Sequence, residues 1–62
     1  MELYIKEVDR IKTYFGDYNI IFYLLDDHDR VLNRCVSSSP EWARYDLLRG
    51  HDEWKDAEIK FI

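Results

Sequence analysis

The densest group of metal-ligating side chains is the segment Asp26-Asp27-His28-Asp29. Carboxylate oxygens are the ligands that Ca²⁺ and Mg²⁺ prefer in proteins, so a cation site in this loop has to be considered. An EF-hand loop that starts at Asp27 has glycine at its sixth position and glutamate at its twelfth, where this chain has Leu32 and Ser38. Because aspartate is also common in turns, we predict a solvated turn with no bound metal or other cofactor, and we keep a metal-binding loop over Asp26 to Asp29 as the alternative.

The chain also contains side chains of the kinds used in nucleophilic catalysis, which needs a serine or cysteine within hydrogen-bond reach of a base. The available residues are Ser37, Ser38, Ser39, Cys35, His28 and His51. No nucleophile motif surrounds any of them. Helix capping accounts for the serines, and Cys35 lies in an apolar segment, where a free cysteine behaves as a small buried residue. A second polar cluster, His51-Asp52-Glu53, would join the aspartate loop only if the fold brought the two together. We therefore expect that the protein is not an enzyme.

Length and composition restrict the chain to one small domain. It has 62 residues, of which 47% are hydrophobic and 16% aromatic, so we expect a folded core. Its single cysteine cannot form an internal disulfide, and small domains without such staples often rely on oligomerisation. Charges soon follow Met1, and the longest apolar run, residues 20–25, is much shorter than the roughly 20 residues that span a membrane. We expect a cytoplasmic protein.

The charge argues against two classes of partner. Thirteen acidic and nine basic residues give a formal net charge of −4, which repels a phosphate backbone at long range. The basic residues are scattered among acidic ones, as in Lys6-Glu7 and Asp29-Arg30. We therefore expect no direct contact with nucleic acid and none with a membrane. An acidic protein can also occupy a basic nucleic-acid-binding groove on another protein, and we keep such an inhibitor as a further alternative.

The first segment has the spacing of an amphipathic helix. Tyr4, Val8, Ile11 and Phe15 fall within about 60° of one another on a helical wheel. Gly16 follows, and glycine in the left-handed conformation commonly ends a helix. These features predict a helix over residues 2–15.

Two strands and a second helix are expected next. Residues 18–25 are rich in aromatic and β-branched side chains, which favour a strand. Residues 31–36 form a second apolar run, and the polar segment between them fits a hairpin loop, so the two strands should be antiparallel neighbours. Serines at 37–39 then mark the start of a helix over residues 40–49, either as a capping box from Ser38 or as a cap by Ser39 before Pro40.

Residues 56–62 alternate between apolar and charged side chains, which predicts a half-buried third strand. The expected fold class is therefore α+β, with the element order α-β-β-α-β. Two helices are available to cover a three-stranded, mainly antiparallel sheet.

The strand over residues 18–25 is apolar on both faces, so both faces need a cover. If both helices pack on one side, Ile21, Tyr23 and Leu25 remain exposed on the other side, and a large exposed apolar patch usually marks a partner surface. The alternative is that one helix covers each face and leaves no patch. The sequence does not separate these arrangements.

The second helix offers another candidate surface, since Trp42, Tyr45 and Arg49 share one side of it while Ala43 and Leu47 share the other. Tryptophan, tyrosine and arginine are enriched at binding hot spots. The alternative interpretation is that Trp42 fills the small core and Arg49 extends around it.

The working hypothesis is a protein-interaction or regulatory module that binds a protein partner, including a second copy of itself in a homodimer. Its contact surface is expected to include Ile21 and Tyr23 on the sheet, or Trp42, Tyr45 and Arg49 on the second helix. The short, acidic, linker-free chain is also compatible with an accessory protein of a mobile element.

Overall fold

The N-terminal segment forms a long strand, β1 (Glu2–Lys12), and the predicted helix over residues 2–15 is wrong. The computed structural model describes all 62 residues. Leu3 and Ile5 are buried whereas Tyr4 is half-buried and Lys6 is exposed, which is the alternation of a strand. A β-bulge between Glu7 and Asp9 then inserts one extra residue and shifts this alternation.

A tight turn joins β1 to β2 (Tyr18–Leu25). The N–H of Gly16 donates to the carbonyl of Thr13 at 3.1 Å, and the N–H of Thr13 donates to the carbonyl of Asp17 at 2.7 Å. Gly16 has a φ of +91°, which is the left-handed conformation required in a three-residue hairpin loop. Gly16 therefore closes a hairpin and does not end a helix.

β2 and β3 (Val31–Ser37) form the predicted hairpin. β2 occupies the residues expected for it, and β3 extends one residue further than expected. β2 pairs antiparallel with both β1 and β3, so it lies in the interior of the sheet. An interior strand buries one or both faces, which agrees with its apolar composition.

The one α-helix, α1 (Pro40–Leu48), begins where it was expected. The hydroxyl oxygen of Ser39 accepts a hydrogen bond from the N–H of Trp42 at 3.4 Å, so Ser39 is the N-cap and the capping box from Ser38 is not formed. The helix ends at Leu48, with Arg49 as its C-cap and Gly50 following at a φ of +79°. No helix of the structure is both long and apolar enough to cross a membrane.

The last strand is shorter than predicted and pairs in parallel. A 3-10 turn at Asp52–Trp54 precedes β4 (Glu58–Phe61), which lies beside β1. Parallel strands need a crossover connection, and α1 with the 3-10 turn supplies it. The sheet is therefore four-stranded and mixed, in the order β3-β2-β1-β4, where three strands were predicted. It is mainly antiparallel as expected, because β2 pairs antiparallel with β1 and β3, and only β1 and β4 are parallel. The element order is β-β-β-α-β with one helix, where α-β-β-α-β with two helices was predicted.

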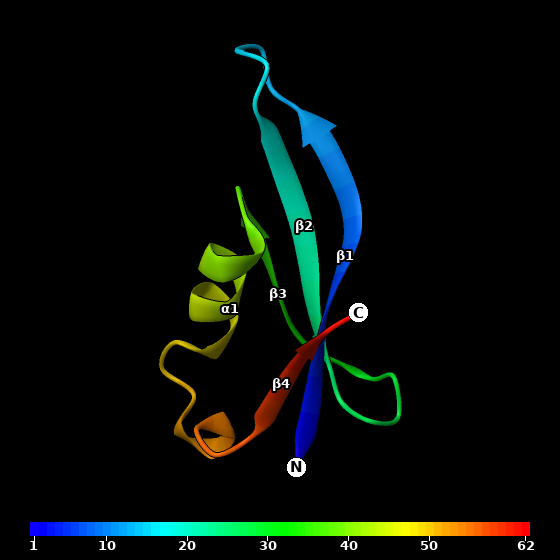
Figure 1. Ribbon diagram of the computed structural model, residues 1–62, viewed down its shortest axis with the longest axis vertical. Helices are drawn as coiled ribbons and strands as arrows, with labels where there is room; N and C mark the ends of the chain where they lie inside the picture. Colours follow the sequence, from blue (N-terminus) through cyan, green and yellow to red (C-terminus); the bar gives the residue numbers. More distant parts are fainter.

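The resulting small α+β domain has two layers, because α1 and the 3-10 turn lie on the same side of the sheet (Figure 1). The core between the layers contains Leu3, Ile5, Ile20, Phe22, Leu24, Ala43 and Leu47, with Cys35, Leu48, Trp54, Ala57 and Ile59 packed against it. The β1–β2 hairpin extends beyond α1 and gives the molecule a length of 38 Å. No helix covers the other side of the sheet.

Candidate interaction surface

The side of the sheet opposite α1, called the open face below, follows from strand alternation. Leu3, Ile5 and Phe22 point into the core, so their neighbours along β1 and β2 point the other way. The open face consists of the side chains of Tyr4, Lys6, Asp9, Ile11, Ile21, Tyr23, Arg34, Val36 and Lys60. Each of these residues is half-buried or exposed. Ile21 and Tyr23 lie on the interior strand β2, so the two sheet residues expected from the sequence are at the centre of this surface.

Two adjacent rows of side chains cross β1, β2 and β3 on the open face. The Lys6 row contains Lys6, Tyr23 and Arg34, and the Asp9 row contains Asp9, Ile21 and Val36. Successive residues on one face of a strand are about 6.6 to 6.8 Å apart, which is also the separation of the two rows. The Lys6 row carries only positive charge and the Asp9 row only negative charge. Neither Lys6 nor Arg34 forms an ion pair within the chain.

A hydrogen-bonded group closes one end of the open face. The hydroxyl of Tyr4 donates to Oε2 of Glu2 at 2.7 Å, and Nζ of Lys60 donates to Oε1 of Glu2 at 3.2 Å. The bond from Tyr4 is the main reason that the pKa of Glu2 is lowered, followed by the bond from Lys60. The same contacts raise the pKa of Tyr4 and of Lys60. Glu2 thus fixes the Tyr4 ring and neutralises the charge of Lys60, which leaves Lys6 and Arg34 as the unpaired cations of the surface.

A hollow of about 330 Å³ lies over the β2–β3 half of the open face and is lined by Ile21, Arg34, Cys35 and Val36. Ile21 and Val36 are register partners that form its apolar floor. Arg34 supplies a charge at its edge. The hollow is large enough to receive a side chain of a partner. The thiol of Cys35 points to the other side, where its Sγ lies 3.9 Å from the carbonyl oxygen of Ala43, and burial raises its pKa.

The second predicted surface lies on α1, on the side of the molecule away from the open face. Trp42 is 62% exposed and Tyr45 is 57% exposed, and their rings meet edge to face at 6.3 Å. The guanidinium of Arg49 lies 5.8 Å from the centre of the Tyr45 ring. Ala43 and Leu47 supply the buried side of the helix. The interpretation of Trp42 as a core residue is therefore wrong, and the sequence-predicted residues divide between two separate surfaces.

The most exposed aromatic pair was missed by sequence reasoning. Tyr14 and Phe15, at the tip of the β1–β2 hairpin, are 96% and 87% exposed, and their rings meet edge to face at 5.4 Å. Assigning residues 2–15 to a helix placed Phe15 on an apolar stripe. Gly16-Asp17 is compatible with a hairpin turn, but it fits the end of a helix equally well.

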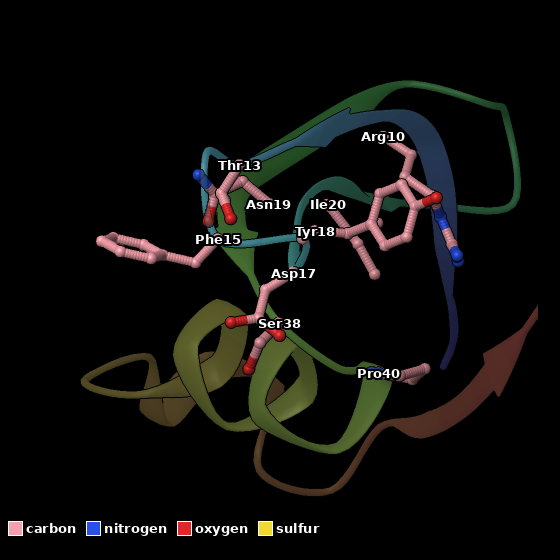
Figure 2. A pocket seen from close by; sticks show the side chains of 10 residues that line it. Arg10, Thr13, Phe15, Asp17, Tyr18, Asn19, Ile20, Ser38 and Pro40 are labelled. Atoms are coloured by element: carbon pink, nitrogen blue, oxygen red, sulfur yellow. The ribbon is translucent and has the colours of Figure 1, made fainter.

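A cleft of about 690 Å³ separates the protruding hairpin from the start of α1 (Figure 2). Its lining is Arg10, Thr13, Phe15, Gly16, Asp17, Tyr18, Asn19, Ile20, Ser38 and Pro40. Arg10 and Asp17 are the charged residues of this lining. The guanidinium of Arg10 lies 5.1 Å from the Tyr18 ring centre and donates to Oε1 of Glu7 at 2.7 Å. These contacts occupy Arg10 within its own hairpin.

The aspartate loop is held by its own hydrogen bonds. Oδ1 of Asp26 accepts from the N–H of His28 at 2.8 Å and from the N–H of Arg30 at 3.0 Å, and Oδ2 accepts from Nε of Arg30 at 2.8 Å. His51, in the second polar cluster, stacks on Trp54 and lies 2.9 Å from Glu53. No group of three or more His, Cys, Asp or Glu side chains is arranged so that it could hold a metal ion. Asp26 therefore organises a turn.

Because of these hydrogen bonds, protonation of Asp26 in acid should lower the stability of the folded chain. The hydrogen bond from the Arg30 N–H is the largest of the contacts that lower the pKa of Asp26. The unfolded chain then binds more protons than the folded chain near the ordinary aspartate pKa of about 4, so stability falls as the pH falls. The contribution of Asp26 is fully present above that pH and is lost as the pH drops through the lowered folded pKa. Urea unfolding from neutral pH to about pH 2 measures this loss.

Two variants test whether Asp26 causes this loss of stability in acid. Asp26→Asn should be less stable than the wild type at neutral pH and approach it in acid, because only the wild type loses the contribution. Asp27→Asn is the control, since that carboxylate is exposed and makes only a 3.7 Å contact with His28. The assignment fails if wild type and Asp26→Asn lose stability in parallel as the pH falls.

Among these features, only the open face joins apolar side chains, aromatic rings and unpaired charges on one continuous surface of the sheet. The α1 cluster and the hairpin tip each have only two exposed aromatic rings. No protein-family model matches the chain, and no curated protein or solved structure matches it either.

Proposed function

We propose that the chain is a protein-interaction module that acts by binding a protein partner through the open face of its sheet. The observation that carries the proposal is the position of α1 and the 3-10 turn, which both lie on the opposite side. Ile21 and Tyr23 are left without a covering layer on an interior strand. Contiguous apolar surface of this kind usually marks a contact with another protein.

The composition of the open face supports the same function. Interface centres are enriched in tyrosine and arginine, and the Lys6 row places Tyr23 next to Arg34. The hollow beside Ile21 can receive a partner side chain. The hydrogen-bonded group of Glu2, Tyr4 and Lys60 supplies a polar rim at one end. An apolar centre with a polar rim is the usual composition of a protein interface.

A photocrosslinking residue at position 23 tests the proposal in the cells that express the chain. Illumination is expected to give a discrete adduct with a protein, because this position lies at the centre of the contact. The same photocrosslinker at position 42, on the outer side of α1, is the matched control. It is expected to give no adduct of that mass.

Two second-site changes make the test specific. Ile21→Lys, which places a charge beside position 23, should abolish the adduct, while Tyr45→Ala, on α1, should leave it unchanged. An absence of adducts from position 23, or an adduct that survives Ile21→Lys, would rule out the open face as the contact surface.

A further inference from the structure

We infer that the protein covering the open face is a second copy of this chain, docked face to face with its strands antiparallel to those of the first copy. This inference rests on the proposed function and adds the identity and orientation of the partner. It is carried by the charge pattern of the two rows. The Lys6 row is positive, the adjacent Asp9 row is negative, and both cross the same three strands.

A two-fold axis that runs across the strands between the two rows brings each row opposite the other row of the second copy. Lys6 then faces Asp9 of the second copy, and Asp9 faces Lys6 of the second copy. Tyr23 faces Ile21 of the second copy in the same way. Two-fold symmetry makes each contact occur twice, so one copy satisfies the charges of the other.

The apolar side chains also match in this arrangement. Val36 faces the aliphatic part of Arg34 of the second copy, and Tyr4 faces Ile11 of the second copy, since each pair is related by the same axis. Sheets that pack face to face keep their strand directions within about 30° of each other, so the rows stay in register over this short distance. The ring of Tyr23 is placed next to the hollow beside Ile21 of the second copy.

Neighbouring positions of the axis are disfavoured by charge. An axis through the Lys6 row places Lys6 opposite Lys6 and Arg34 opposite Arg34 of the second copy. An axis shifted further in the same direction, between Tyr4 and Lys6, places Asp9 opposite Glu2 of the second copy. An axis shifted the other way, through the Asp9 row, places Asp9 opposite Asp9 of the second copy. Like charges directly opposite one another across an interface are unfavourable. Of these axes, only the one between the two rows places Lys6 opposite Asp9, so the Lys6–Asp9 pairs select the register among them.

Charge-reversal variants test this register by sedimentation. The wild-type chain is expected to form a dimer at high concentration. Lys6→Asp places two acids opposite each other, Asp9→Lys places two cations opposite each other, and each is expected to raise the dimer dissociation constant at least tenfold. The double variant Lys6→Asp/Asp9→Lys restores opposite charges and should dimerise nearly as well as the wild type.

The single variants also separate local pairing from net charge. Lys6→Asp makes the chain more acidic and Asp9→Lys makes it less acidic, so an effect of net charge would change dimerisation in opposite directions. Lys12→Asp is the control, because it changes the net charge by the same amount as Lys6→Asp. Lys12 is the register partner of Tyr18 and lies on the other side of the sheet from the open face, so this variant should leave the dissociation constant unchanged. Circular dichroism confirms that every variant is folded.

Three results would overturn the inference. They are a wild-type chain that is monomeric at every concentration, a dimer that both single variants leave intact, and a double variant that stays monomeric. If position 23 then still crosslinks to another protein, the open face remains a contact surface and only its occupant changes. If position 23 gives no adduct either, the proposed function fails as well.

Discussion

Replacing Phe22 with alanine is expected to lower the free energy of unfolding by about 3 to 5 kcal/mol. Its ring is buried on the interior strand β2, in the same cluster as Leu3 and Leu24. At the usual 0.05 to 0.15 kcal/mol per residue, 62 residues provide roughly 3 to 9 kcal/mol in total. This one truncation therefore removes a large part of the stability, and urea unfolding followed by circular dichroism measures the change.

Ile21→Ala is the matched control, because Ile21 is the preceding residue of the same strand and lies on the open face. Because the Ile21 side chain is half-buried, its truncation should lower the free energy of unfolding by only about 1 kcal/mol in a dilute, monomeric sample. Phe22→Leu keeps most of the apolar volume and provides a measurable loss if Phe22→Ala does not fold. Similar losses for Ile21→Ala and Phe22→Ala would contradict the assignment of the two faces.

The main error of prediction concerns the first segment, and the bulge explains it. A regular strand repeats every two residues, so its apolar positions would not give the helical spacing of Tyr4, Val8 and Ile11. Residues seven apart in a regular strand lie on opposite faces. The extra residue at the bulge between Glu7 and Asp9 shifts the alternation by one, so that Tyr4 and Ile11 lie on the same face. Gly16 did not discriminate, because helix ends and hairpin turns both use its left-handed conformation.

The remaining elements were predicted where the signals are local. The composition of residues 18–25 and the start of the helix at Pro40 are read directly from neighbouring residues, and both match the structure. Of the two caps that the sequence offered, Ser39 is the one formed. The alternation of residues 56–62 indicated a strand, of which Glu58–Phe61 is formed. Its parallel pairing with β1 depends on a segment more than fifty residues away, and no local pattern specifies such a partner.

The candidate surface was predicted only in part, for the same reason. Ile21 and Tyr23 belong to a correctly predicted strand, so alternation placed them on one face, but the sequence did not decide whether that face is covered. Leu25, which was expected to be exposed beside them if both helices packed on the other side, is buried. Lys6 and Asp9 belong to the segment assigned to a helix, and the two charged rows appear only when β1 is paired with β2. Trp42, Tyr45 and Arg49 were correctly placed on one side of α1, but composition alone did not decide between core and surface.

Replacing Leu47 with alanine is expected to cost about 2 to 5 kcal/mol, whereas Trp42→Ala should cost less than about 1 kcal/mol. Leu47 is fully buried against the sheet, while Trp42 contacts Tyr45 at the surface. A nine-residue helix is marginal in water on its own and depends on packing. Leu47 and Ala43 are the buried residues of α1, so shortening Leu47 should detach the helix and expose the core side of β2 and β3. Urea unfolding of the two variants compares them directly, and a larger loss for Trp42→Ala would mean that α1 packs through its aromatic side.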